Sequence, residues 1–184
     1  MKTIEIKITI MCIFSYLLSL PFIKLFYIIL MHLFEKNIKK LGIIIPDLPV
    51  ALANYVPLKI VDNFIYISGQ APVKNGEMQF TGKVGKDISI EEGIKAAELC
   101  CINILSGLKK AINADWEKLD SFVKLGGFVN CLDDFADHPK IINGASNLLV
   151  NIFGDKGKHT RFAVGSNSLP MNISVEIDAI IKIR

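Results

Sequence analysis

A long amphipathic helix constrains the fold of this chain more than any other segment. In the sequence SIEE, Ser89 and Glu92 have the spacing of a capping box, which satisfies free backbone N–H groups at a helix start. Apolar residues then recur every three or four positions: Ile94, Ala97, Cys101, Ile104, Leu108 and Ile112. Because this spacing puts them on one face of a helix that runs to about Ala111, that face must pack against a sheet or a second helix.

Strand-like runs on both sides of this helix would supply the sheet. The predicted strands are 56–61, 64–68, a short one near 77–81, 121–131, 161–165 and 174–183. Asp62-Asn63 and Asn75-Gly76 are favourable turn pairs, so the first two runs form a hairpin and the third follows a tight turn. Within 121–131, the pair Gly126-Gly127 predicts a bulge or a close backbone approach.

Two further helices complete the predicted domain. Residues 35–41 form a short helix that ends at Gly42, and Asp137 with Pro139 begins another helix that Gly154 ends. The resulting order is β-β-(β)-α-β-α-β-β. It predicts a single α+β domain in which two helices cover one face of a mostly antiparallel sheet.

Composition excludes several classes of protein. Apolar residues make up 51% and charged residues 21% of the 184-residue chain, which excludes a disordered chain. The formal net charge of +3 is too small to indicate a nucleic-acid-binding domain. The cysteines are Cys12, Cys100, Cys101 and Cys131. They contain no C-x-x-C pair and occur with only three histidines, so they fit neither a disulfide framework nor a zinc site and suit a reducing compartment.

The first thirty residues differ in character from the rest. Between residues 8 and 34 only Lys24 is charged, so this stretch could cross a bilayer as a helix. Three lysines between residues 36 and 40 would then keep the following domain in the cytoplasm. Pro21 and Lys24 weaken the anchor hypothesis, and we favour residues 1–30 as a dispensable leader or an over-extended gene start. The domain 31–184 would then be cytoplasmic, with a net charge of +1, because residues 1–30 hold three Lys and one Glu.

Two polar clusters are candidate ion-binding sites. The acidic cluster comprises Asp133, Asp134, Asp137 and His138, and the basic cluster comprises Lys156, Lys158, His159 and Arg161. The first could hold a divalent cation, but it lacks the spacing of a known calcium loop, so we favour a solvated loop with a helix cap. The second could bind a phosphate, but a few exposed lysines usually form a solvated turn. Cys100 and Cys101 fall inside a helix, where buried structural thiols are expected.

One carboxylate stands out against its surroundings. Glu176 lies in the otherwise apolar last strand, where its charge needs a cation, and Arg161 on the preceding strand is the expected partner. Structural and functional ion pairs both perturb pKa values, so the pattern leaves open which of the two this pair is.

Several short motifs together resemble the RidA/YjgF family, whose members are also labelled endoribonuclease L-PSP or translation-initiation-inhibitor-like proteins. The residues that carry the resemblance are Tyr55, Ser68-Gly69-Gln70, and the pattern R-x-x-V-x₄-L-P-x₄-V-E-I that begins at Arg161 and includes Glu176. The resemblance runs from about Glu35 to Ile183, and stretches such as ANYVP, GKVGKD, GFVN and INGAS indicate a divergent branch. It implies a chorismate-mutase-like α+β fold, assembled as a homotrimer with its sites between subunits.

The resemblance also implies an activity, with neither a cofactor nor a metal. Members of the family hydrolyse reactive 2-imino acids, which are products of pyridoxal-phosphate-dependent dehydratases, to 2-oxo acids and ammonia. Arg161 matches the arginine that grips the substrate carboxylate, and Glu176 matches the acid that positions or activates water near the imine carbon. Tyr55, Ser68 and Asn143 match residues that line the site, Asn143 only after a one-residue shift in loop length.

From the resemblance we expect Arg161 and Glu176 to lie on neighbouring strands and to face a shared crevice where subunits meet. One difference from the family concerns the pocket, because Ala163 stands where other members often have a cysteine. This difference leaves the preferred imino acid open.

Two other functions remain as alternatives. The family labels suggest RNA cleavage or inhibition of translation, but the mild charge and the absence of aromatic residues among the basic ones argue against a nucleic-acid partner. A non-catalytic trimer that binds small molecules in the same clefts is the second alternative.

Overall fold

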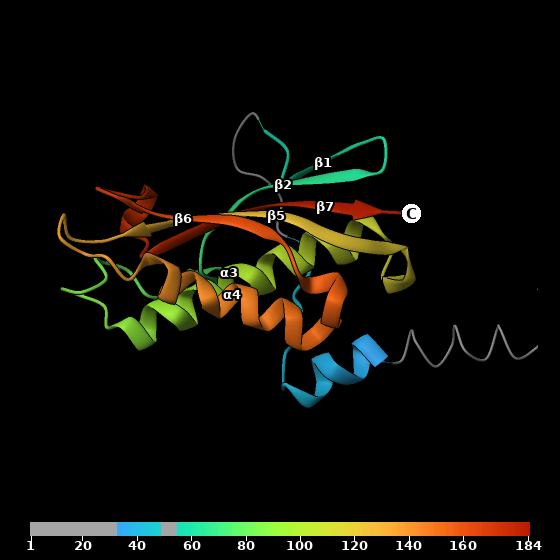
Figure 1. Cartoon of the computed structure of the whole chain (residues 1–184), viewed down its shortest axis with the longest axis horizontal. Helices are drawn as coiled ribbons and strands as arrows, with labels where there is room; N and C mark the ends of the chain where they lie inside the picture. Colours follow the sequence, from blue (N-terminus) through green and yellow to red (C-terminus); the bar gives the residue numbers. More distant parts are fainter. Residues whose placement is uncertain (1–32, 49–54) are drawn as a thin grey trace, which may run out of the picture.

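The computed structural model describes residues 33–48 and 55–184, and the predicted leader 1–30 lies outside these residues. Five strands form the main sheet in the order β1-β2-β7-β5-β6 (Figure 1). The strands are β1 (Leu58–Val61), β2 (Phe64–Gln70), β5 (Leu119–Asn130), β6 (Thr160–Ser166) and β7 (Val175–Ile183). Strands β5 and β6 are parallel and all other pairs in this sheet are antiparallel. A separate two-stranded sheet pairs β3 (Val73–Lys74) with β4 (Glu77–Met78).

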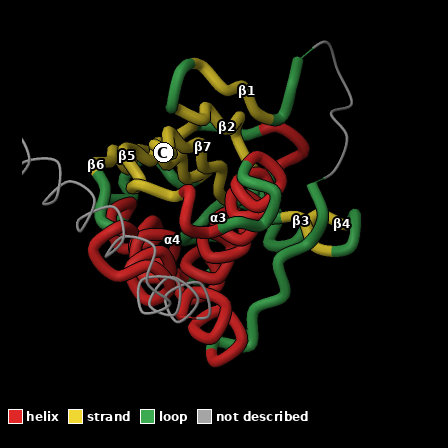
Figure 2. The backbone as a smooth tube through the Cα atoms, turned by 90° about the vertical axis from the view of Figure 1, so that its right-hand side faces the viewer, coloured by secondary structure: helices red, strands yellow, loops and turns green. Residues whose placement is uncertain are grey.

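Two long helices, α3 (Ile90–Ala111) and α4 (His138–Phe153), cover one face of the main sheet (Figures 1 and 2). The predicted α+β fold with a mostly antiparallel sheet is therefore confirmed. Single 3₁₀ turns at Trp116–Lys118 (η1), Gly154–Gly157 (η2) and Pro170–Asn172 (η3) complete the connections.

Helix α3 begins as the capping box predicts. Ser89 Oγ accepts a hydrogen bond from the Glu92 backbone N–H, and the Glu92 carboxylate accepts one from the Ser89 N–H. The predicted stripe is buried with the exception of Ile94, which is half-buried. Cys100 and Cys101 are completely buried, and burial raises the pKa of both thiols. They are therefore inert structural thiols, as expected.

Helix α4 begins after Asp137 and ends before Gly154, as predicted, although the Asp137 side chain makes no capping hydrogen bond. The helix lies close to both the sheet and α3 because glycines face it. A methyl group on Gly127 of β5 would come 2.7 Å from the Ile142 side chain. Gly126-Gly127 thus marks a close backbone approach, and the bulges of β5 lie between residues 119 and 124 instead.

The hairpin β1–β2 turns at Asp62, whose positive φ of 52° suits the turn, and Asn75-Gly76 joins β3 to β4. Residues 33–40 form the predicted short helix, which ends in a turn at Gly42 with a φ of +67°. The centroids of the Phe34 and Phe153 rings are 5.2 Å apart, so this segment contacts the end of α4. Among the residues described, no helix has the length and apolar character needed to span a bilayer.

The face of the sheet opposite the helices is left open by the described part of the chain (Figure 2). Its apolar side chains include Tyr66, Phe128 and Val164, which are 45%, 38% and 42% exposed. Two acids, Glu176 and Asp178, project from β7 on the same face. An exposed aromatic and aliphatic surface of this kind usually marks a contact with another molecule.

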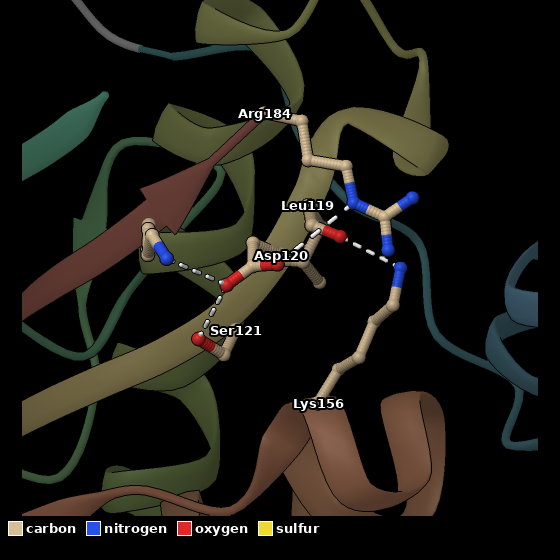
Figure 3. Close-up of polar contacts among 6 residues, drawn as sticks. Leu119, Asp120, Ser121, Lys156 and Arg184 are labelled. Carbon is tan, nitrogen blue, oxygen red and sulfur yellow. Dashed lines mark hydrogen bonds and ion pairs between the residues drawn. The ribbon is translucent and has the colours of Figure 1, made fainter. Parts of the chain in front are cut away.

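The predicted basic cluster is divided between separate contacts at one end of the sheet. Lys156 donates a hydrogen bond of 2.7 Å to the carbonyl oxygen of Leu119, and burial lowers its pKa (Figure 3). In the same region Arg184 forms an ion pair with Asp120, with 3.8 Å between Arg184 Nε and Asp120 Oδ1. Lys158 instead pairs with Asp155 on the exposed surface. Lys156 therefore joins η2 to the start of β5, Lys158 pairs with an acid of η2, and the two lysines do not share one anion site.

The contact between α3 and α4 gives a test of the packing. A methyl group on Gly144 of α4 would overlap the backbone carbonyl oxygen of Ile94, which cannot move without distorting α3. We expect Gly144→Ala to lower the free energy of unfolding by about 1–3 kcal/mol, although alanine favours helices over glycine by roughly 1 kcal/mol. Urea denaturation measures this change.

Asn147→Ala is the matched control, because Asn147 is exposed on the same helix. There the helix propensity of alanine acts alone and should leave the stability equal or slightly higher. Equal stability of Gly144→Ala and the native protein would contradict the close approach of the two helices.

Candidate functional site

Arg161 lies on β6, and its side chain points toward α4. Its register partner on β5 is Leu125, which is fully buried beneath the helices, so both residues share the helix-covered face. The guanidinium donates from Nη1 to Ser146 Oγ (2.7 Å), and from Nη2 to Asn143 Oδ1 (2.8 Å) and the Pro139 carbonyl oxygen (3.2 Å). Its Nε–H and second Nη1–H have no acceptor among the described residues and can bind an anion.

His159, two residues before Arg161 and just before β6 begins, extends this network. Its Nε2 lies 3.1 Å from Ser146 Oγ and its Nδ1 lies 2.7 Å from the Gly157 carbonyl oxygen. Burial lowers the pKa of His159, and the charge of Arg161 lowers it further, although the Gly157 contact acts in the opposite direction. We call Arg161, Asn143, Ser146 and His159 the helix-side cluster.

Glu176 lies on β7 and points away from the helices. It pairs in register with Phe128 on the open face, and a methyl group on Gly69 of β2 would overlap its carboxylate. Burial raises the pKa of Glu176, and the negative charge of Asp178 on the same face raises it further. Within the described part of the chain no cation pairs with this carboxylate. It is therefore a half-buried acid that can still accept a proton or a hydrogen bond.

Ser68 lies on β2 next to Gly69, the residue against which Glu176 packs, and Tyr55 lies in the segment before β1. Ser68 precedes Gly69, and its hydroxyl donates a hydrogen bond of 2.9 Å to the carbonyl oxygen of Val56. This bond holds the segment that begins at Tyr55, whose side chain is 57% exposed, beside β2. We call Glu176, Gly69 and Ser68 the open-face cluster; the predicted site residue Tyr55 is connected to it only through the hydrogen bond between Ser68 and the neighbouring Val56.

The expected shared crevice does not exist within one chain. Strand β5 separates β6 from β7, so Arg161 and Glu176 are not on neighbouring strands. Their register partners, Leu125 and Phe128, are an odd number of residues apart and face opposite sides of the sheet. The expected ion pair between Arg161 and Glu176 is therefore wrong. The sequence-predicted site residues divide into two groups, with Asn143 beside Arg161 and Ser68 beside Glu176.

The predicted acidic cluster contributes to a loop and a helix start. Asp133, Asp134 and Asp137 are exposed, and His138 instead contacts Cys131, with 3.4 Å between Nε2 and Sγ. Among the residues that the structure describes, no three His, Cys, Asp or Glu side chains lie together in a way that could hold a metal ion.

Sequence reasoning missed Ser146 and the role of His159. A signal for Ser146 was present, because positions 139, 143 and 146 follow the spacing of one helix face and can meet the same side chain. His159 was assigned to a solvated basic turn because its contact with Ser146 depends on how η2 and β6 pack against α4.

Comparisons with known proteins agree with this architecture. Residues 35–180 match the family described as "YjgF/chorismate mutase-like, putative endoribonuclease". The chain is 33% identical over 149 residues to Protein TCP17 of Trypanosoma cruzi, covering 80% of this chain and 92% of that protein. Among solved structures, the protein Atu1372 of Agrobacterium tumefaciens, of unknown function, matches at 43% identity with a TM-score of 0.80, covering 87% of this chain and 99% of that one.

A "putative endoribonuclease" from Shewanella oneidensis has a similar structure, with 30% identity and a TM-score of 0.78 over 82% of this chain and 99% of that one. The family match over residues 35–180 includes every residue of the helix-side and open-face clusters. On this family match, together with the fold and the matching residues, the chain belongs to the YjgF/chorismate-mutase-like family.

Proposed function

We propose that this protein hydrolyses small 2-imino acids to 2-oxo acids and ammonia without a cofactor. The observation that carries the proposal is a pre-ordered guanidinium, Arg161, together with a half-buried acid, Glu176, whose pKa is raised. A planar, permanently charged guanidinium suits a carboxylate, and a carboxyl group with a raised pKa suits proton transfer near neutral pH.

The two groups would act together in a site between two copies of the chain. Arg161 lies on β6 and the exposed apolar side chains lie on the open face, where one copy can cover another. In this arrangement the helix-side cluster of one copy meets the open-face cluster of the next. A ring of such contacts has one site at each interface, which fits the homotrimer that the family resemblance implies.

The reaction follows from the positions of the two groups. The substrate carboxylate accepts hydrogen bonds from the Nε–H and the second Nη1–H of Arg161, the groups that have no acceptor among the described residues, with the imine carbon toward the neighbouring subunit. On the protonated, iminium form of the substrate, Glu176 takes a proton from water as the oxygen attacks that carbon, and a neutral tetrahedral carbinolamine forms. The protonated Glu176 then gives the proton to nitrogen, and the resulting carboxylate removes the hydroxyl proton as the C–N bond breaks, so ammonia and the 2-oxo acid leave. Glu176 finally releases to water the proton that the iminium brought. Tyr55 and Ser68 would line the opening.

RNA cleavage fits the same residues less well. Glu176 and Asp178 project together from the open face, where they would repel a phosphate backbone. We place the reaction in the cytoplasm, which agrees with the free thiols of Cys100, Cys101 and Cys131.

Arg161→Ala tests the anchoring role. We expect it to lower kcat/KM for a freshly generated 2-imino acid by roughly 100-fold or more, because the carboxylate loses its charge-assisted hydrogen bonds. Coupled measurement of ammonia or 2-oxo acid release records the rate. Lys110→Ala removes an exposed cation from the last turn of α3, outside both clusters, and should have little effect. Activity equal to that of the native protein in Arg161→Ala would contradict the proposal.

Mixing two inactive variants tests the site between subunits. Arg161→Ala and Glu176→Gln should each be inactive. When the two are co-expressed, an interface can combine the intact Glu176 of an Arg161→Ala subunit with the intact Arg161 of a Glu176→Gln subunit. Random assembly would restore about a quarter of the sites. Ammonia release from the purified mixture measures this recovery, and complete inactivity of mixed oligomers would place both groups of a site in one chain.

Asp178→Asn tests the proton-transfer role of Glu176. The Asp178 charge raises the pKa of Glu176, so its removal lowers that pKa. If the deprotonated acid accepts the proton of water, activity falls as pH drops through this pKa. We therefore expect the acidic limb of the kcat/KM profile to move to lower pH in Asp178→Asn. An acidic limb that does not move, or moves to higher pH, would assign it to another group.

A further inference from the structure

A chain of hydrogen bonds runs behind the Arg161 guanidinium. From the Gly157 carbonyl oxygen it passes to His159 Nδ1 (2.7 Å), from His159 Nε2 to Ser146 Oγ (3.1 Å), and from Ser146 Oγ to Arg161 Nη1 (2.7 Å). It joins η2, β6 and α4 in the part of the fold that holds the helix-side cluster.

A neutral His159 ring allows one order of protons along this chain. A carbonyl oxygen only accepts, so His159 Nδ1 must carry the hydrogen that Gly157 receives. The neutral ring then has a lone pair on Nε2, which accepts the Ser146 hydroxyl hydrogen. The Ser146 oxygen lone pairs are left for Arg161. The neutral ring agrees with the lowered pKa of His159, which burial causes and the charge of Arg161 enhances.

The order of protons matters because a serine hydroxyl can rotate. Without an acceptor at Nε2 the hydrogen of Ser146 could turn toward the guanidinium and repel it. With His159 in place, Ser146 presents a lone pair to Nη1, while Asn143 and the Pro139 carbonyl oxygen hold Nη2. The three acceptors occupy one face of α4, so the guanidinium is held from one side and its other N–H groups stay available.

We propose that Ser146 and His159 are positioning residues that orient Arg161 to bind the carboxylate of the substrate. The inference rests on the proposed function for its effect on activity, but the orientation of Arg161 can be measured by itself. His159 acts through Ser146, and Ser146 acts through Arg161. Neither side chain takes part in the reaction at the imine carbon.

Kinetics of four variants test the effect on the reaction. We expect Ser146→Ala to raise KM about tenfold, through loss of a hydrogen bond to a charged group, with kcat changed by about twofold or less. Ser146→Thr keeps the hydroxyl and should restore KM. His159→Ala should raise KM, and adding it to Ser146→Ala should raise KM no further, because both act on one contact. Asn147→Ala, exposed on the same helix, is the control.

Nitrogen-15 NMR of arginine and histidine side chains tests the orientation without using activity. The chain has two arginines, Arg161 and Arg184, so the spectrum of labelled arginine has an internal control. In the native protein, His159 should show the tautomer protonated at Nδ1, and the Arg161 guanidinium should exchange its protons slowly. In Ser146→Ala the Arg161 signal should shift and exchange faster, while the Arg184 signal, held near Asp120, stays unchanged.

The two measurements separate the possible failures. A changed Arg161 signal in a protein that never releases ammonia supports the positioning role and overturns the proposed function. Normal activity with an unchanged Arg161 signal and an unchanged KM in Ser146→Ala overturns the positioning role and leaves the proposed function in place. A raised KM that Ser146→Thr does not restore, or a His159 tautomer protonated at Nε2, also overturns it.

Discussion

The parallel pairing of β6 with β5 is the constraint on which the rest of the structure depends. It places Arg161 in register with Leu125, beneath the helices, whereas the antiparallel pairing of β5 with β7 places Glu176 beside Phe128 on the open face. The sheet itself therefore lies between the two charged groups. Because neither can reach the other, the chemistry that requires both needs a second copy of the chain.

Each cluster also reflects the cost of keeping a charge in a partly buried place. Three hydrogen-bond acceptors on α4 stabilise the charge of Arg161 and hold its guanidinium in place in the absence of substrate. Glu176 lacks such compensation among the described residues, and its pKa rises as a result. In the proposed reaction the first group binds an anion and the second exchanges a proton. This division of roles comes from the local environment and not from the residue types alone.

Local patterns predicted the elements well because their physical causes are local. The capping box at Ser89, the turn at Asp62 and the glycine that ends the first short helix each depend on residues within one turn of the chain. The close approach at Gly127 was one of two options, and only the position of Ile142 on α4 decided between them. The contact of His159 with Ser146 could not be predicted, because it joins a turn to a helix surface through their packing.

The sequence by itself determined the helices, the strands of the main sheet and the α+β class, because side-chain periodicity is a property of the chain alone, and it indicated candidate residues for binding a carboxylate and moving a proton. The tertiary structure decided which strands are neighbours and which face each side chain occupies. Strand order depends on contacts between residues far apart in the sequence, and a strand's alternation reveals two faces without showing which one the helices cover. For that reason Arg161 and Glu176, fifteen positions apart in the sequence, lie on opposite faces of one sheet.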